Sequence, residues 1–251
     1  MTETRVDLHV KVLDEQVVRR AKARGLDVLV YAPHFTRLDD VRDRARRFSD
    51  DELLIVPARE VFTGSWRNRK HVLALGLEAG VPDFVSLEGA FDAFRAQGAT
   101  VLAPHPEFLT VSLDRSDLRR YATDVAAVEV YNPKHLSRHN RRARAVRADL
   151  ALPAFGSSYA HLPATVGEVW TVVEGPVDST ADLCDALERG ALDRVERRSG
   201  PRHRSRCLAE GAHLFWENSA EKVDRVLLSG REATHPGQPA YEGRFDDVAV
   251  Y

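Results

Sequence analysis

Cysteine is scarce in this chain. The 251 residues include only Cys184 and Cys207, which do not form a C-x-x-C pair, so the sequence gives no sign of a disulfide framework. The first residues, MTETRVDLHV, lack the basic and then apolar pattern of a secretory signal. No apolar run approaches the roughly 20 residues that a membrane span needs. We therefore expect a cytoplasmic protein with no membrane partner.

An excess of one charge sign is also missing. The formal net charge is only -2 although 29% of the residues are charged, so acidic and basic side chains must mix on the surface. This balance lacks the strong positive excess that is typical of nucleic-acid-binding proteins. Only five of the 36 basic residues are lysine and the rest are arginine, which we interpret first as coding bias and only second as phosphate chemistry.

What the sequence does contain is a regular alternation of strand-like and helix-like segments. Short apolar runs predict the strands, and periodic segments between them predict helices, some of which end in glycine. This alternation is typical of a β/α barrel or a doubly wound sheet. The predicted strands are 6–10, 28–32, 53–58, 72–75, 100–103, 127–131, 152–156 and 169–173, and the predicted helices are 15–23, 38–48, 87–97, 116–122, 137–150 and 180–188.

The composition changes after about residue 178. Beyond the helix predicted at 180–188 lie an arginine-rich link over 194–206, an amphipathic helix near 220–228, and a tail rich in proline and glycine. We expect this tail to lie on the surface without regular structure. The sequence is therefore divided into a β/α barrel core, residues 1–178, and a C-terminal helical extension and tail packed on the barrel, residues 179–251.

Histidine ends four of the strand-like segments, in the sequences VDLH, VYAPH, VLAPH and GSSYAH. In parallel α/β folds the carboxyl ends of the strands meet at one edge, where functional side chains converge. A single histidine at such a position is more often structural, but four of them predict a site. They are His9, His34, His105 and His161.

Two further residues point to the same edge. Glu60 ends the run LLIVPARE, and His71 opens HVLALGL. Glutamate is almost never buried without a partner, so Glu60 is an odd choice for a simple core strand. The remaining histidines lie in helical, basic or tail segments and are assigned to solvated or capping positions. They are His135, His139, His203, His213 and His235.

The order of these residues resembles the PHP superfamily, named for polymerase-associated and histidinol-phosphatase domains, over roughly residues 5 to 175. The segments that carry the resemblance are DLHVK, YAPH, PAREV, HVLALGL, APHPEF, VEVYN and GSSYAH. The resemblance implies a distorted seven-stranded β/α barrel. It also implies divalent metal ions held by an H-x-H motif, a D-H motif, a glutamate, two isolated histidines and a D-x-H motif.

Three of the nine ligand positions depart from the family pattern. Lys11 stands in place of the second histidine of H-x-H, Pro33 in place of one aspartate, and Tyr159 in place of another. Lysine as a cation has no lone pair, proline has no side-chain donor atom, and tyrosine must first lose a proton with a pKa of about 10. We therefore expect one metal ion rather than three.

One metal position of the family keeps its whole ligand set, Glu60, His71 and His105. Such a set suits zinc, manganese or iron. For Lys11 two interpretations remain open. Its ammonium either occupies the region of the first metal and supplies positive charge beside Glu60, or extends to solvent from a decayed site.

Two functions follow from the resemblance. The first is a metal-dependent phosphoesterase-like hydrolase acting on a phosphorylated small molecule or nucleotide. The rim residues expected to neutralise the phosphate or to move a proton are His9, Lys11, His34 and His161. The loop cations expected to bind the substrate are Arg67, Arg69 and Lys134.

The second function is a catalytically inactive barrel that serves as a binding or regulatory protein. A nucleic-acid-binding version would use the arginines of 137–150 and 196–206. The complete three-ligand set favours the enzyme. The sequence leaves open the substrate, the identity of the metal and the oligomeric state.

Overall fold

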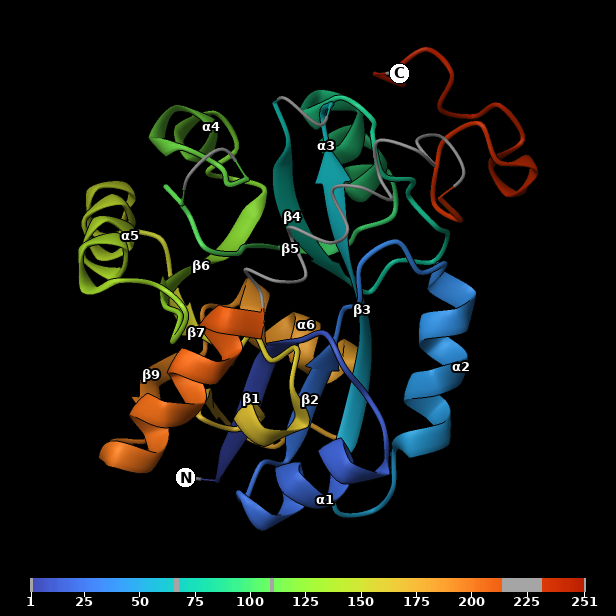
Figure 1. The fold of residues 1–251 in the computed structure, drawn as a ribbon. Helices are drawn as coiled ribbons and strands as arrows, with labels where there is room; N and C mark the ends of the chain where they lie inside the picture. The colour runs from blue at the N-terminus through green and yellow to red at the C-terminus, as the bar shows by residue number, and fades with distance from the viewer. Residues whose placement is uncertain (1, 66–67, 109–110, 214–231, 251) are drawn as a thin grey trace.

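The computed structural model describes residues 2–65, 68–108, 111–213 and 232–250. Nine strands form one sheet in the order β7-β6-β5-β4-β3-β2-β1-β8-β9, and helices lie around it (Figure 1). The α/β class is as expected, but the seven strands implied by the family resemblance are corrected to nine. The strands are β1 (Glu3–Val10), β2 (Val28–Tyr31), β3 (Leu54–Thr63), β4 (Lys70–Leu75), β5 (Thr100–Ala103), β6 (Val125–Tyr131), β7 (Ala154–Gly156), β8 (Val169–Glu174) and β9 (Leu192–Arg197).

The helices connect and cover these strands. Among the described helices, none has the length and apolar character to cross a membrane. Residues 201–213 are also helical and are called the C-terminal helix below. The other helices are α1 (Glu15–Ala23), α2 (Leu38–Phe48), α3 (Leu87–Ala96), α4 (Arg115–Arg120), α5 (Ser137–Leu150) and α6 (Thr180–Glu188), with 3-10 turns η1 (Pro163–Thr165) and η2 (Pro239–Tyr241).

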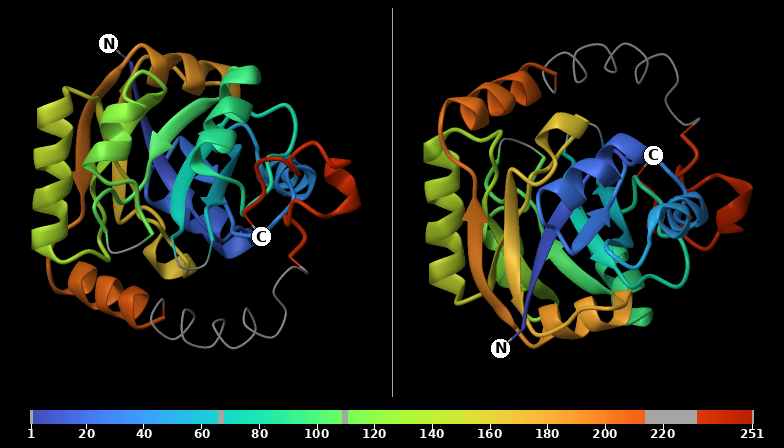
Figure 2. Two further views of the ribbon diagram at one scale, coloured as in Figure 1. Left: turned by 90° about the horizontal axis from the view of Figure 1, so that it is seen from above. Right: turned by 90° about the horizontal axis from the view of Figure 1, so that it is seen from below.

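The sheet curves until its two ends nearly meet. The hydroxyl of Thr171 on β8 donates to the carbonyl of Gly156 on β7 and accepts from its N–H, both at 2.9 Å. A Cβ added at Gly156 would lie 2.4 Å from Val195 Cγ1 on β9, so only glycine permits this close approach. The contact closes the sheet into a barrel-like shape. Figure 2 shows α5 and the C-terminal helix on the side of β7 and β9.

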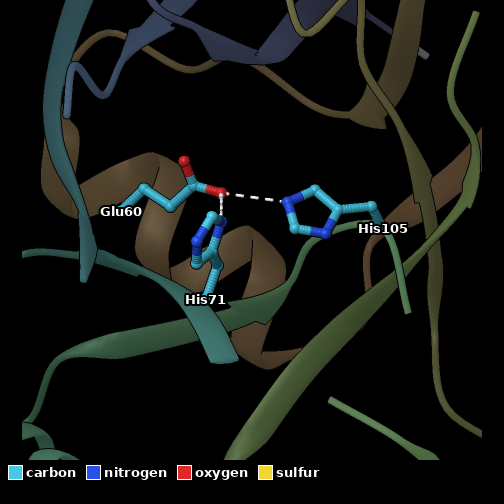
Figure 3. Close-up of side chains that lie close together, drawn as sticks. All are labelled: Glu60, His71 and His105. Carbon is cyan, nitrogen blue, oxygen red and sulfur yellow. Dashed lines mark hydrogen bonds and ion pairs between the residues drawn. The ribbon is translucent and has the colours of Figure 1, made fainter. Parts of the chain in front are cut away.

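Three neighbouring strands bring the central site residues together (Figure 3). Strands β3 and β4 are antiparallel with Phe62 opposite His71, and Glu60 lies two residues along β3 on the same face. Strand β5 is antiparallel to β4, so the residues that follow β5, including His105, arrive at the same end. Strand pairing alone thus places one carboxylate and two imidazoles side by side.

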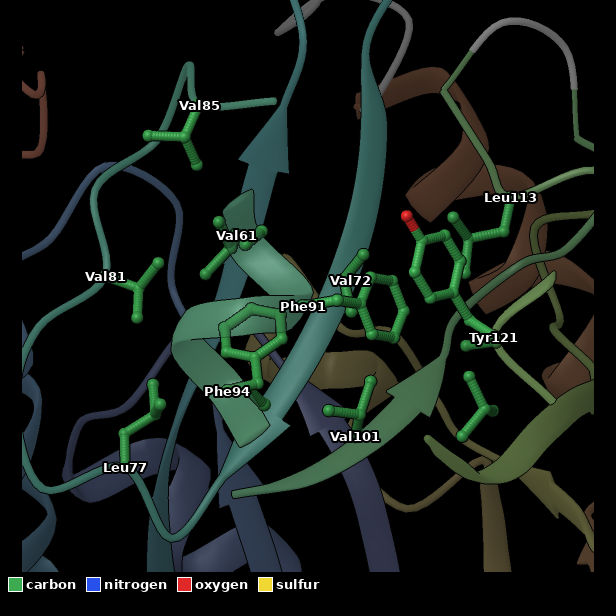
Figure 4. Close-up of a cluster of buried hydrophobic side chains, with 14 of the residues drawn as sticks. Val61, Val72, Leu77, Val81, Val85, Phe91, Phe94, Val101, Leu113 and Tyr121 are labelled. Atoms are coloured by element: carbon green, nitrogen blue, oxygen red, sulfur yellow. The ribbon is translucent and has the colours of Figure 1, made fainter. Parts of the chain in front are cut away.

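The outer faces of these strands form part of the hydrophobic core. Helix α3 buries Phe91 against Val61, Val72 and Val101 of β3, β4 and β5 (Figure 4). The ring of Phe91 stacks on that of Tyr121 at 3.9 Å between centroids with an interplanar angle of 6°. A second cluster fills the inner face, where Leu73 lies opposite Glu60, with buried side chains of β1 to β8 and of α6. The strands that carry the site are therefore held rigidly from outside.

The C-terminal region differs from the prediction in two places. The arginine-rich link expected over 194–206 is instead the end of β9 and the start of the C-terminal helix. The tail is not merely a surface segment, because Tyr241 and Phe245 are buried in the same cluster as Phe91. The prediction relied on the proline and glycine composition of the tail, but burial of these two aromatic side chains holds the tail against the core. The helix predicted near 220–228 lies outside the described residues.

A buried ion pair ties the tail to the barrel. Asp83 accepts from Arg59 Nη2 at 3.0 Å and from the N–H of Phe62 at 2.7 Å. The hydroxyl of Thr234 donates to the same carboxylate, and the N–H of Asp83 donates to the Thr234 carbonyl at 2.9 Å. Arg59 and Asp83 are both buried. Neither could lose its partner without leaving an uncompensated charge in the interior.

We therefore expect Asp83→Ala to lower the free energy of unfolding by about 3–5 kcal/mol, as for a buried charge pair that has lost one partner. Urea denaturation followed by tryptophan fluorescence measures the change. Asp92→Ala is the matched control, because Asp92 pairs with Arg95 on the surface with 62% of its side chain exposed, and its loss should cost less than about 1 kcal/mol. Equal effects of the two substitutions would contradict a stabilising role for Asp83.

Candidate metal centre

The carboxylate of Glu60 lies at the centre of four imidazoles. It is buried, with 1% of the residue exposed. Its Oε1 lies 3.0 Å from His105 Nε2 and 3.3 Å from His71 Nδ1 (Figure 3). Its Oε2 lies 3.3 Å from His34 Nδ1 and 3.5 Å from His9 Nε2. Four strand-end or strand residues predicted from the sequence therefore meet at one carboxylate.

Lys11 also meets this carboxylate. Its ammonium contacts Glu60 Oε2 and donates to the carbonyl of Ala32 at 2.5 Å, and only 4% of the Lys11 side chain is exposed. The interpretation that Lys11 extends to solvent is therefore wrong. Burial alone would raise the pKa of Glu60, but the positive charge of Lys11 holds that pKa well below its usual range. Glu60 is ionised at neutral pH.

Three of these imidazoles, those of His9, His34 and His71, have pKa values below the usual value. Burial, and after it the charge of Lys11, lowers the pKa of His9 to about 3 and holds the pKa of His34 well below its usual value. Burial also lowers the pKa of His71. A neutral imidazole keeps one lone pair, which is the form that binds a metal ion.

The hydrogen bonds of His105 orient one such lone pair toward Glu60. The hydroxyl of Ser112 donates to the Phe108 carbonyl at 2.9 Å, so at 3.0 Å it accepts from His105 Nδ1. When the imidazole is neutral, this network assigns its proton to Nδ1, and the lone pair of Nε2 then faces Glu60 Oε1. Two acceptors 3.0 Å apart repel each other unless a cation lies between them.

His71 differs from His105 in that neither of its ring nitrogens makes a hydrogen bond. Neither its Nδ1 nor its Nε2 has a partner of hydrogen-bond geometry, although both are buried, and the same is true of His9. Such orphaned buried atoms are rare in native proteins. One atom each from Glu60, His71 and His105 lie within 4.8 Å of one another, and tetrahedral ligands with bonds of about 2.0–2.1 Å lie roughly 3.3 Å apart. These three residues fit a divalent metal ion.

A second lysine lies in the same site. Lys134 was predicted to bind substrate from a loop, and its side chain is only 2% exposed. Its ammonium lies 2.5 Å from His161 Nδ1 and 3.0 Å from Glu210 Oε1. It also lies 4.1 Å from the centre of the Tyr159 ring. His161, which the family resemblance assigns to a second metal position, thus has an ammonium group beside it.

Glu210 is a site residue that the sequence did not indicate. It comes from the C-terminal helix and accepts from the N–H of His161 at 2.6 Å and of Leu162 at 3.2 Å. Burial would raise its pKa, but the hydrogen bond from His161 and the charge of Lys134 lower that pKa to about 2. A single glutamate four residues beyond the arginine-rich link carries no signal that could have predicted this contact.

Tyr159 and His105 adopt strained backbone conformations. Their φ angles are 46° and 35°, in the left-handed region that side chains other than glycine rarely adopt. The ring of Tyr159 lies 4.6 Å from that of His9 and 5.4 Å from that of His105. Strain of this kind costs of order 1–3 kcal/mol and clusters at functional sites.

The remaining predicted residues have mixed outcomes. Arg67 lies outside the described residues. Arg69 is half-buried with its guanidinium 5.4 Å from the ring of Phe62. Of the two alternatives given for His139 and His203, solvated or capping, the solvated one is wrong, because both residues are buried. The catalytic and substrate-binding roles given to the rim residues and loop cations stay predictions.

The comparisons with known proteins fit this geometry. A family model described as PHP-associated matches residues 137–192. PsfC from Pseudomonas syringae superposes with a TM-score of 0.65 at 20% identity, over 88% of this chain and 100% of that one. The lesion-specific endonuclease PfuEndoQ from Pyrococcus furiosus gives 0.58 at 14% identity, over 75% of this chain and 56% of that one.

A third solved structure has a more distant likeness. An amidohydrolase from Chromobacterium violaceum, with bound sulfate and no metal, has a TM-score of 0.51 at 15% identity, over 76% of this chain and 97% of that one. No curated protein matches the sequence.

The depressed pKa of Glu210 predicts an acid-sensitive stability. A carboxylate with a folded pKa of about 2 contributes stability above its unfolded pKa, and that contribution is lost as the pH falls below about 4.3. In urea denaturation between pH 5 and pH 3, the wild type should lose about 1.5–2 kcal/mol more than Glu210→Gln. Glu88→Gln is the surface control and should behave as the wild type. Parallel curves for wild type and Glu210→Gln would contradict this prediction.

Proposed function

We propose that the chain is a member of the PHP superfamily and that it is a metal-dependent phosphoric ester hydrolase with a single metal ion. The observation that supports this proposal is the set of Glu60, His71 and His105, with the lone pair of His105 Nε2 facing the carboxylate. A divalent zinc, manganese or iron ion held there supplies a Lewis acid for a phosphoryl oxygen and lowers the pKa of a water molecule.

The two buried lysines supply fixed positive charge beside this set. The ammonium of Lys11 lies 5.7 Å and that of Lys134 lies 4.1 Å from the centre of the Tyr159 ring. The lysines are the cationic groups next to the imidazoles that attract a phosphate. In this proposal they replace part of the electrostatic role of the two family metal ions that the sequence no longer supports.

The exposure of the site residues indicates where a substrate enters. His34 has 24% of its side chain exposed, more than any other imidazole around Glu60. A phosphorylated small molecule or nucleotide approaching past His34 would present its phosphate to the interior. The buried imidazoles and Tyr159 then exclude water from the other sides of that group.

A second candidate function is supported by one specific contact. The Lys11 ammonium against Glu60 is an ion pair that neutralises the carboxylate without any metal ion, and Lys134 with Glu210 repeats the arrangement. A barrel with both pairs satisfied can retain its fold while serving only as a binding or regulatory protein.

Metal content distinguishes the two functions. Purified wild-type protein analysed by mass spectrometry should contain close to one equivalent of zinc, manganese or iron. In His71→Ala the metal should be lost because one ligand is gone, while the Lys11 and Glu60 pair stays intact. His213→Ala is the matched control on the C-terminal helix. Metal-free wild-type protein, even after incubation with each ion, would support the non-catalytic function instead.

Hydrolysis is tested on the same samples. Wild-type protein with its metal should release phosphate from a panel of sugar phosphates and nucleotides, and His71→Ala should be at least about 100-fold slower because the loss of a ligand removes the Lewis acid. Equal rates for the two proteins would contradict the proposed centre.

Lys11 offers a direct test of the replacement of a metal ion by an ammonium group. Lys11→His restores the H-x-H motif and should raise the bound metal above one equivalent. Lys11→Met removes the charge without adding a ligand, so its metal content should not exceed that of the wild type. Its affinity for phosphate should fall about tenfold, since a charge-assisted hydrogen bond is worth about 1.5–3 kcal/mol. Unchanged phosphate affinity in Lys11→Met would contradict the assigned role.

A further inference from the structure

A second group of ionisable side chains lies around Glu168, at the entry to β8, and no step of the proposed reaction uses it. It lines a cleft of about 490 Å³ between the end of α1, the end of β9 and the first turns of the C-terminal helix. The volume is within the range of small-molecule sites. Its lining residues are Arg24, Glu168, Trp170, Arg197, Arg198, Ser199, Arg202, His203 and Arg206.

Glu168 holds the cleft together. Only 1% of the residue is exposed, and it accepts from Arg24 Nη2 and Arg206 Nη1 at 2.8 Å each. Its other oxygen lies 2.8 Å from His203 Nδ1, and Arg20 Nη2 adds a further contact at 3.2 Å. A single negative charge is thus shared among three guanidinium groups and one imidazole, so the cluster keeps a positive excess.

The other arginines of the lining increase this excess. Arg197 donates to the hydroxyl of Tyr131 at 2.9 Å, and Arg198 makes a long contact of 3.4 Å with the Arg24 carbonyl. Within the described ranges, neither these two nor Arg202 forms an ion pair. Positive charges gathered in a concave site raise the local concentration of anions.

The cleft also has more hydrogen-bond donors than acceptors. Arg198 Nε and Trp170 Nε1 are buried and have no partner. The C-terminal helix begins at the cleft, where its first N–H groups favour negative charge. Burial, and after it the charge of Arg20, lowers the pKa of Arg24 to about 10, which reflects the crowding of cations. All of these features favour an oxyanion.

We infer that this cleft binds the phosphate group of a ligand, at a site separate from the Glu60 centre. Guanidinium groups match phosphate oxygens in planar, paired hydrogen bonds, and the exposed Arg197 and Arg202 line the cleft. The phosphate belongs either to a free phosphorylated molecule or to a nucleic-acid strand, because both present the same oxyanion.

Calorimetric titration with inorganic pyrophosphate and fluorescence anisotropy with a labelled oligothymidylate test this inference. The double variant Arg198→Gln/Arg202→Gln should bind about tenfold or more weakly than the wild type, because two charge-assisted donors are lost. Arg141→Gln/Arg142→Gln is the matched control, since it removes the same charge from exposed positions on α5. Its affinity should stay within about twofold.

The two probes identify the source of the phosphate. Loss of pyrophosphate binding in the cleft variant indicates a free ligand, and loss of oligothymidylate binding alone indicates a strand. An equal loss of probe affinity in the α5 control would mean that the effect comes from general surface charge, and it would overturn the inference. Failure of the wild type to bind either probe would also overturn it. In the His71→Ala background, where the proposed metal centre has lost a ligand, Arg198→Gln/Arg202→Gln should weaken probe binding by the same factor as in the wild-type background, and this result separates the cleft from any failure of the proposed metal centre.

Discussion

The ionised carboxylate of Glu60 is the constraint on which the site depends. A charge buried in a protein interior costs several kcal/mol unless partners compensate it. Lys11 supplies the opposite charge, and the imidazoles of His9 and His34 around it are kept neutral by the same burial. Strands β3, β4 and β5 bring these groups together by simple pairing, and α3 fixes the strands from outside. The electrostatics, the protonation states and the strand packing therefore all follow from one charge.

The two sides of the site differ in the positive charge that they can place beside buried imidazoles. On one side of it, Glu60, His71 and His105 present ligand atoms with lone pairs, which is the chemistry of a divalent ion. On the other side, Lys134 and Glu210 place an ammonium group beside His161 and close to Tyr159. An ammonium ion brings one positive charge and three donors but no open coordination position. In the proposed reaction, a substrate phosphate would therefore be attracted by both sides and activated on only one.

The sequence predicted much of the fold because local signals agreed with tertiary packing. The boundaries of α1, α2, α5 and α6 match the predicted helices, and the histidines at the strand ends converge as the β/α alternation implies. The contact between Lys134 and Glu210 could not be predicted, since it joins segments 76 residues apart without any local pattern. Strand β9 was missed because LDRVER lacks the alternation of a half-buried strand. The burial of the tail was not predicted, because the prediction relied on the proline and glycine content of the segment and not on its two aromatic residues.

The position of Glu210 on the C-terminal helix has a consequence for how the molecule is made. His9 belongs to the first strand, whereas Glu210 lies beyond the last one, and its carboxylate accepts the N–H groups of His161 and Leu162. During synthesis, chains fold as their segments emerge from the ribosome. The barrel strands emerge first, with Lys134 and His161 still without their acidic partner. The site is therefore completed only after residue 210 has left the exit tunnel, and until then a nascent chain holds an unfinished centre.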